Sequence, residues 1–285
     1  MRLKILHRTR YRYSQPVSEN YNEVRLQPVS DEGQECHGYR LVTEPVAKVE
    51  RYHDFHFNLV DHFYLKEPHG ELVLESCSEV TTRARAADSE VPWFPVARLG
   101  ECQRLERCYD FLQPSEYVSL GVEVWRVGQD LVSGVDDAWQ LALRIMGHIH
   151  ETFVYEAGST TVSTTMEEAL RERRGVCQDF AHVMLGLCRS TGIPARYVSG
   201  YLHVPAGTAL RGDLASHAWV EVYLPRHGWM GLDPTNNRMA DEHHVKVAVG
   251  RDYADAAPVR GNFKGRAEQT MTAEVRIEPV KGVED

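Results

Sequence analysis

The first 85 residues alternate apolar and polar side chains over short stretches that end at proline or glycine. Alternation with a period of two places every second side chain on one face of a strand, and Pro and Gly mark the turns. The stretches that show this pattern cover residues 4–13, 23–27, 39–42, 62–65 and 71–82. Residues 1–85 are therefore predicted to form an antiparallel, sandwich-like β domain.

The second half of the chain adds patterns with a helical period. Trp139, Leu143 and Met146 recur at helical spacing behind Asp136 and Asp137, either of which can cap a helix. A second buried stripe runs from Phe180 to Cys188, directly after Cys177. Between them, Thr165 and Glu168 form a capping box for a short helix that Gly175 ends.

Strand-like stretches follow the second helical stripe, which Gly192 and Pro194 terminate. They cover residues 195–204, 217–224, 228–233 and 271–277, with a hairpin turn at 225–228. A helix packed on an antiparallel sheet belongs to the α+β class. We thus expect a β domain at 1–85, a bridging segment at 86–130 with two short helices, and a catalytic domain at 131–285.

Composition narrows the class of partner. The 285 residues are 42% hydrophobic and 26% charged, which is ordinary for a soluble globular protein. A formal charge of −9 argues against nonspecific nucleic-acid binding, which needs a basic surface. The chain also lacks the apolar run of about 7–15 residues of a secretory signal and the run of about 20 of a membrane helix. We therefore expect a cytosolic protein with neither nucleic acid nor membrane as a partner.

The cysteines and histidines give no metal-binding pattern. None of the six cysteines forms a CxxC pair. Cys177 and Cys188 lie on one predicted helix, about 16 Å apart, which is too far for a disulfide. The spacings of His53, His56, His62 and His69 likewise match no compact ligand set. We expect no metal and no cofactor.

Cys177 stands where a loop ends and an amphipathic helix begins. The first turn of a helix has unpaired N–H groups and the positive end of the macrodipole, so a thiolate is stabilised there. Arg173 and Arg174 can add positive potential, and the backbone N–H of Cys177 can donate to an oxyanion. A cysteine at a helix start is also often purely structural.

His217 and Asp233 supply the base and the orienting group that a cysteine nucleophile needs. His217 begins one predicted strand and shares a face with Trp219, away from the aliphatic face. Asp233 ends the partner strand of the hairpin, so the two side chains can meet across the sheet and fix the imidazole tautomer. Each residue alone also has a structural interpretation, a satisfied strand histidine or an Asp-Pro-Thr turn.

Four segments around these residues resemble the transglutaminase-like superfamily, which is related in fold to papain-like cysteine proteases. They are Arg174–Ala181, Gly192–Tyr201, Ser216–Tyr223 and Gly228–Asn236. Residues 1–82, including Tyr52–Asn58, resemble the N-terminal β domain of the bacterial branch, and 250–253 and 258–261 resemble its C-terminal segment. One departure is His56, where the family has a glycine before the asparagine, and this puts the turn in doubt.

The resemblance implies thiol acyl transfer by a Cys177, His217 and Asp233 catalytic triad. Cys177 would attack an amide carbonyl of a peptide or protein, His217 would move protons and Asp233 would orient His217. Water as acceptor gives a protease or amidase, which we favour, and an amine gives a cross-linking transglutaminase. A binding module that keeps only the fold is a third alternative. Five residues are candidates for the substrate cleft, with core, capping or loop roles as the alternative: Tyr155, Asp179, Trp219, Asp252 and Tyr253.

Overall fold

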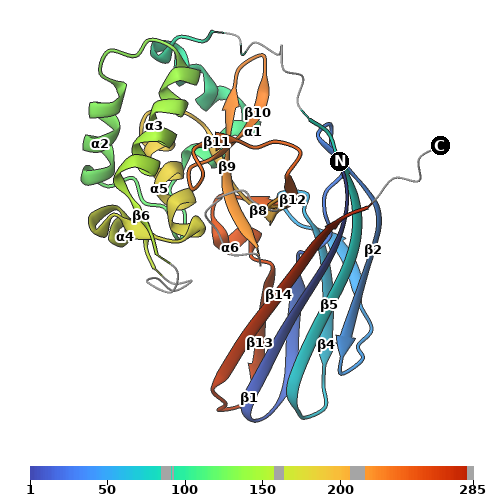
Figure 1. The fold of residues 1–285 in the computed structure, drawn as a ribbon. Coiled ribbons are helices and arrows are strands. Elements are labelled where there is room, and N and C mark those ends of the chain that lie inside the picture. Colours follow the sequence, from blue (N-terminus) through green and yellow to red (C-terminus); the bar gives the residue numbers. More distant parts are fainter. Residues whose placement is uncertain (85–90, 92, 157–163, 206–215, 281–285) are drawn as a thin grey trace, which may run out of the picture.

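The computed structural model describes residues 1–84, 91, 93–156, 164–205 and 216–280. It consists of an elongated β unit and a second unit in which helices pack on a sheet (Figure 1). The observed architecture confirms the expected fold class, an N-terminal antiparallel β region followed by an α+β core in which helices pack on an antiparallel sheet.

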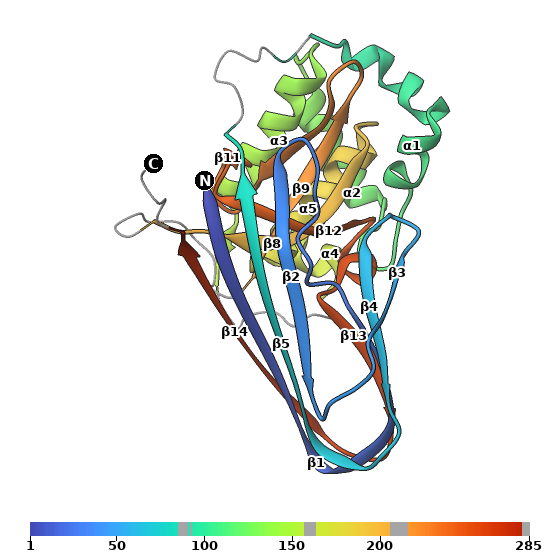
Figure 2. The same ribbon diagram turned by 90° about the vertical axis from the view of Figure 1, so that its right-hand side faces the viewer.

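Seven strands form the β unit, and the long first strand connects its two layers. Residues 2–13 of β1 pair with β5 and β14, whereas its residues 18–24 pair with β4 and β13. Figure 2 shows the strand bending between the layers. The strands are β1 (Arg2–Val24), β2 (Gln34–Glu44), β3 (Glu50–His53), β4 (Leu59–Leu65), β5 (His69–Thr82), β13 (Val259–Lys264) and β14 (Gln269–Pro279).

The bend in β1 lies at Pro16, where the sequence predicts the end of a strand. The pairing with β5 shifts register between Arg12 and Val17, so the missing N–H of Pro16 removes no ladder hydrogen bond there. Strand prediction was therefore wrong in dividing β1 into two strands. A small apolar core stabilises the unit and consists of Val24, Leu26, Phe63, Leu65, Leu72 and Leu74.

The last two strands return to the β unit. β14 pairs with the first half of β1, from Leu3 opposite Pro279 to Tyr13 opposite Gln269. The range 131–285 that the sequence assigns to the catalytic domain thus includes two strands that belong to the N-terminal sheet. Consequently residues 2–24 and 259–279, from opposite ends of the described chain, lie in one structural unit.

The second unit contains a five-stranded antiparallel sheet in the order β11-β10-β9-β8-β12. Helix α5 (Cys177–Ser190) packs on β8 and β9, and its side chains from Gln178 to Arg189 are all buried. The predicted stripe on α5 is therefore confirmed, and α5 is enclosed on its other sides as well. The strands are β8 (Ala195–Leu202), β9 (His217–Leu224), β10 (Gly228–Asp233), β11 (Arg238–Met239) and β12 (His244–Gly250).

Helix ends follow the predicted capping chemistry. Asp137 caps α3 (Ala138–Thr152) by accepting the N–H of Gln140. Thr165 and Glu168 form both bonds of the capping box of α4 (Met166–Glu172). Gly192 has a φ of 88°, the left-handed conformation expected behind α5.

The remaining elements lie around α3, α5 and the core sheet, on which α6 packs against β8 and β12. They are the 3₁₀ helices η1 (Val96–Arg104) and η2 (Asp110–Leu112), the helices α1 (Glu106–Tyr109), α2 (Val122–Val132) and α6 (Tyr253–Ala256), and the short strands β6 (Val154–Tyr155) and β7 (Arg174–Gly175). None of the helices in the described ranges is both long and apolar enough to span a bilayer. All six cysteines are free.

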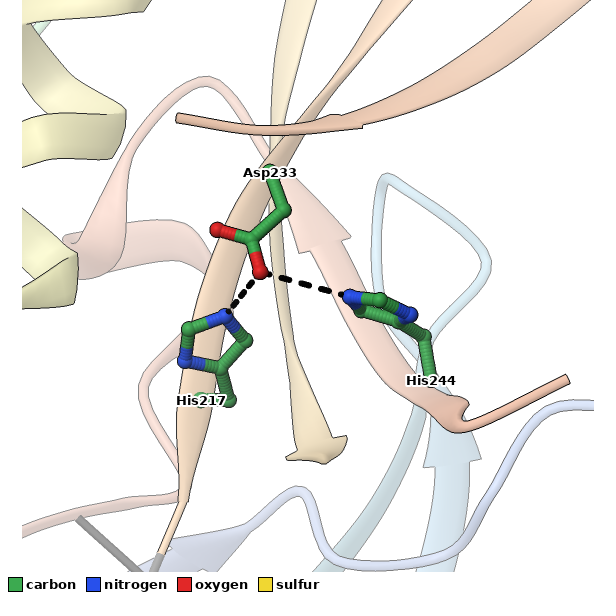
Figure 3. A group of neighbouring side chains, drawn as sticks. All are labelled: His217, Asp233 and His244. Carbon is green, nitrogen blue, oxygen red and sulfur yellow. Dashed lines mark hydrogen bonds and ion pairs between the residues drawn. The ribbon is translucent and has the colours of Figure 1, made fainter. Parts of the chain in front are cut away.

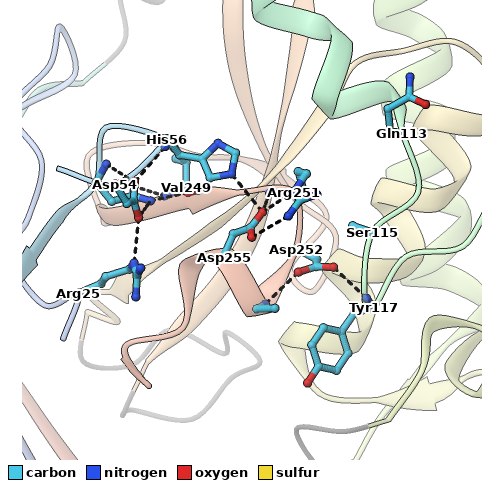
Figure 4. A network of polar contacts seen from close by, with 12 residues as sticks. Arg25, Asp54, His56, Gln113, Ser115, Tyr117, Val249, Arg251, Asp252 and Asp255 are labelled. Carbon is cyan, nitrogen blue, oxygen red and sulfur yellow. Dashed lines mark hydrogen bonds and ion pairs between the residues drawn. The ribbon is translucent and has the colours of Figure 1, made fainter. Parts of the chain in front are cut away.

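The two units are joined through the 54–58 turn. Asn58 exchanges two buried hydrogen bonds with Val249 of β12, at 2.7 and 2.8 Å. His56 Nε2 lies 3.1 Å from an oxygen of Asp255 in α6 (Figure 4). The residue with positive φ in this turn is Phe57, at 62°, so the left-handed position is the one directly before Asn58 and not His56. The turn forms without glycine because Asp54 accepts the N–H groups of His56 and Asn58.

Candidate active site

Cys177 is the first residue of α5 and remains partly exposed, in contrast to the buried helix behind it. The preceding residues are held by Asp179, whose Oδ2 accepts the N–H of Val176 at 2.8 Å. Gly175 permits this contact because a Cβ there would lie 2.5 Å from the same oxygen. The helix start that carries the thiol is thus fixed by a buried cap.

His217 and Asp233 come together across the β9–β10 hairpin. Leu232 pairs with Val220, so Asp233 lies opposite Trp219 and diagonally from His217. His217 Nε2 is 2.8 Å from Asp233 Oδ2, and both side chains are buried (Figure 3). The structure therefore brings the predicted base and its orienting carboxylate into direct contact.

The turn after β10 fixes the rotamer of Asp233. Oδ1 of Asp233 accepts the backbone N–H groups of Thr235, at 2.9 Å, and of Asn236, at 3.3 Å. The side-chain amide of Asn236 donates to Oδ2 at 2.8 Å. The Asp-Pro-Thr turn and the orienting role are therefore compatible, since the same turn holds the carboxylate toward His217.

The charges of this pair stabilise each other. Burial alone would lower the pKa of His217, but the Asp233 carboxylate outweighs it, and the nearby Cys177 side chain acts in the same direction as Asp233. The pKa of His217 is consequently raised to about 10. Burial would raise the pKa of Asp233, yet His217 and His244 hold it well below its usual range. The pair thus favours an imidazolium at His217 beside an ionised Asp233.

The nitrogen of His217 that Asp233 leaves free is Nδ1. Nδ1 is buried, and it has no hydrogen-bond partner among the residues that the structure describes. Because Cys177 interacts with this imidazole, Nδ1 is the atom available for proton exchange with the thiol. The arrangement can support a thiol nucleophile, a base and an orienting carboxylate.

A second imidazole lies at this site that was not predicted from the sequence. His244, at the start of β12, points its Nε2 at Asp233 Oδ2 from a distance of 3.4 Å (Figure 3). Trp219 lies against both rings, stacked on His217 with centroids 6.2 Å apart and edge-on to His244 at 5.3 Å. Gly200 makes room for Trp219, because a Cβ there would lie 2.7 Å from the indole.

His217, Asp233 and His244 are also residue types that bind metal ions, and their ligand atoms lie within 4.8 Å of one another. Both Nε2 atoms, however, face the same carboxylate oxygen at hydrogen-bond distance. A metal there would have to replace the N–H protons that link both rings to Asp233. We therefore interpret the three residues as a hydrogen-bonded group.

The five candidate cleft residues have different surroundings. Asp179 and Asp252 are both buried, Asp179 as the cap of α5 and Asp252 accepting N–H groups of Ala254 and Tyr117 (Figure 4). Trp219 is buried beneath the histidines, and Tyr155 packs against Phe180. The structure therefore gives Asp179 and Asp252 capping contacts and Trp219 and Tyr155 packing contacts.

Tyr253 differs because it lines an open cavity of about 310 Å³ between the two units. Tyr197 connects this cavity with the thiol: its ring is 6.3 Å from that of Tyr253, and burial together with the charge of Cys177 raises its pKa. The other aromatic residues around the cavity are Tyr11, Tyr13, Tyr117 and Phe263.

Comparisons with known proteins identify relatives of both parts of the chain. Residues 126–234 match the model of the transglutaminase-like superfamily, and residues 3–81 match the bacterial transglutaminase-like N-terminal region. An uncharacterized protein of Mycobacterium leprae is 35% identical over 280 residues, covering 97% of this chain and 98% of its own.

Two further relatives carry names that suggest chemistry. The crystal structure of a proposed cysteine protease from Cytophaga hutchinsonii superposes with a TM-score of 0.77 at 25% identity, covering 99% of this chain and 92% of that one. A protein-glutamine gamma-glutamyltransferase of Pseudomonas aeruginosa is 35% identical over 92 residues, which are 30% of this chain and 14% of that protein.

Proposed function

The chain belongs to the transglutaminase-like superfamily, and on that premise we propose that it is a cysteine hydrolase of the protease or amidase type. Its substrates would be peptide or isopeptide amide bonds, cleaved through a thiol acyl-enzyme. The observation that carries the proposal is His217, held by Asp233 on one nitrogen and open to Cys177 on the other. The full-length likeness to the proposed cysteine protease favours hydrolysis.

Cys177 would act as the nucleophile. Its Sγ attacks the amide carbonyl carbon and forms a tetrahedral oxyanion, while His217 holds the proton that the thiol has lost. The C–N bond then breaks, and the leaving amine takes that proton from Nδ1 of His217. A water molecule next attacks the thioester, gives one proton to His217, and releases the carboxylic acid with the thiol restored.

Asp233 would keep Nδ1 available throughout this cycle. Its carboxylate accepts the Nε2–H of His217, which assigns the exchangeable proton to Nδ1 and stabilises the imidazolium. The oxyanion would be stabilised by the backbone N–H of Cys177, since N–H groups in the first helical turn have no intrahelical partner. The α5 dipole favours negative charge at the same place.

A second candidate function is glutamine cross-linking by amine transfer. The similarity to the gamma-glutamyltransferase supports it, although the aligned region is a small part of that protein. Both reactions share the acyl-enzyme, so they differ only in the acceptor. Incorporation of a labelled primary amine into a glutamine-containing protein would favour transfer, and release of ammonia or peptide without incorporation would favour hydrolysis.

The proposed nucleophile can be tested without knowing the substrate. We expect iodoacetamide to alkylate Cys177 faster than Cys36 and Cys77 well below pH 8, because the proposal gives Cys177 an activating partner, His217. Cys36 and Cys77 are also partly exposed and serve as reference thiols without such a partner. The measurement is the labelling rate of each cysteine by mass spectrometry, in wild type and His217→Ala. Equal rates at all three thiols, unchanged in the variant, would exclude an activated thiol and favour a binding module.

The substrate side of the proposal rests on the cavity beside Tyr253. Aromatic rings and the amides of Asn20, Asn22 and Gln269 line it, which suits contacts with a peptide chain.

Cytosolic location and the absence of nucleic-acid and membrane partners stay predictions. Fractionation of cells and detection of the protein in each fraction would test the location.

A further inference from the structure

His244 is a buried imidazole to which the proposed reaction gives no role. Its side chain is 2% exposed and lies on the opposite side of Asp233 from His217 (Figure 3). Both Nε2 atoms approach the same oxygen, Oδ2, at 2.8 Å from His217 and 3.4 Å from His244. The carboxylate therefore lies between two imidazoles that come from different strands, β9 and β12.

The surroundings of His244 determine which nitrogen faces Asp233 as a donor. The backbone N–H of Asp241 points to His244 Nδ1 at 3.1 Å, and Asp241 Oδ1 lies 3.0 Å from the same atom. In the neutral ring Nδ1 accepts that N–H, which leaves the proton on Nε2. In the protonated ring Nδ1–H donates to Oδ1, and Nε2 still carries a proton. In both states Nε2–H donates to Asp233.

Asp241 is itself held in place as an anion. Burial would raise its pKa, but His244, the N–H of His243 and the guanidinium of Arg238 lower it to about 2. Among the described residues, the charged or titratable groups in contact with His244 are thus Asp233, Asp241 and His217, with Arg238 behind Asp241. A chain of polar contacts runs from Arg238 through Asp241, His244 and Asp233 to His217.

We propose that His244 is a positioning residue, whose Nε2–H holds Asp233 Oδ2 in line with His217 and so keeps Nδ1 of His217 available to Cys177. This inference rests on the proposed thiol chemistry. Thr235 and Asn236 also bind Asp233, but they belong to its own turn and move with it. His244 fixes the carboxylate to a separate strand and thereby opposes movement of the whole turn.

The hydrogen bond from His244 to Asp233 and a positive charge on His244 would have opposite effects on His217. The ring centroids of the two histidines are 6.1 Å apart, so a positive charge on His244 would compete for the Asp233 carboxylate and weaken the attraction between Asp233 and the His217 imidazolium. A neutral donor in the same place would keep the geometry without that competition. Glutamine places an N–H near the position of a histidine Nε2, whereas leucine fills the volume without a donor.

The test compares His244→Leu and His244→Gln by the pH profile of Cys177 alkylation, with Cys36 and Cys77 as internal reference thiols. We expect His244→Leu to slow labelling of Cys177 at pH 7 by about 10-fold, less than the ~10⁴-fold loss that follows removal of an orienting carboxylate. His244→Gln should restore the rate to within about 3-fold of wild type, since a neutral donor is enough. His243→Gln is the matched control, because its ring contacts His203 and not Asp233.

A pH profile of His244→Leu that superimposes on wild type would overturn the inference, and so would a loss that His244→Gln fails to restore. A second measurement does not depend on either variant's rate. The ¹⁵N shifts of His217 at one fixed pH should differ from wild type in His244→Leu and return close to wild type in His244→Gln, because the glutamine again donates to Asp233. If wild-type Cys177 reacts no faster than the reference thiols, the thiol chemistry fails, while the ¹⁵N comparison still decides whether His244 acts on His217.

Discussion

The buried pair of His217 and Asp233 makes stability depend on pH in a predictable direction. The carboxylate pKa is lowered, so its stabilisation is present above the ordinary value of about 3.9 and is lost as the pH falls further. The pKa of His217 is raised to about 10, so its stabilisation is complete below about 6.5 and is lost as the pH rises through 10. The interaction is therefore fully present between about pH 4 and 6.5.

Asp233→Asn should accordingly cost most stability in that window. We expect a loss of about 3 kcal/mol in the free energy of unfolding at pH 5–6, because a buried ion pair loses one partner. The difference from wild type should shrink toward pH 3 and toward pH 10. Urea denaturation of both proteins across this pH range measures it, and a difference that stays constant with pH would contradict the predicted ion pair.

At the same scale, some contacts follow from local sequence and others do not. Cys177, His217 and Asp233 stand in motifs, at a helix start and at the two ends of a hairpin, so their approach was predictable. His244 was missed because it lies in a run of polar residues, and its contact with Asp233 depends on the sheet order, which places β12 beside β8. Asp179 and Asp252 were predicted near the substrate, and the structure shows that each also accepts backbone N–H groups at a helix start.

The start of α5 offers a test at the scale of one element. A Cβ on Gly175 would lie 2.5 Å from Asp179 Oδ2, the cap that holds the residues in front of Cys177. Gly175→Ala should therefore destabilise the protein by about 2 kcal/mol and slow alkylation of Cys177. Gly38→Ala is the matched control, since no heavy atom lies within 4 Å of its Cβ position. Equal stability and equal labelling in the two variants would refute the role of this cap.

Elements with strong local signals were predicted well. The apolar stripe of α5 and the left-handed Gly192 behind it are both observed. The continuity of β1 through Pro16 was not predictable, because a proline ends a strand only where its N–H would be needed. The pairing of β13 and β14 with β1 was also beyond local pattern, since alternation indicates the buried face of a strand and not its partner.

At the scale of the whole molecule, hydrogen bonds and an ion-pair bridge join the two units. Asn58 binds both backbone groups of Val249, and Lys246 bridges Asp31 of the first unit to Glu221 of the core sheet, at 2.8 and 2.7 Å. His56 also reaches Asp255 in α6, the helix that carries Tyr253 at the cavity. The β unit thus supports the sheet and the helix that border the candidate site.

A change in the β unit should therefore be detected in the core. All five tryptophans lie at residue 93 or later, so their fluorescence reports only on unfolding outside the N-terminal strands β1–β5. Asn58→Ala removes two buried hydrogen bonds and should lower the stability seen by fluorescence by about 2–3 kcal/mol. Asn262→Ala, at an exposed position of β13, is the control and should leave the curve unchanged.

In each protein circular dichroism should follow the same transition as fluorescence, because cooperative unfolding links both units. A fluorescence midpoint that is unaffected by Asn58→Ala, with a separate dichroism transition, would mean that the β unit and the core unfold independently.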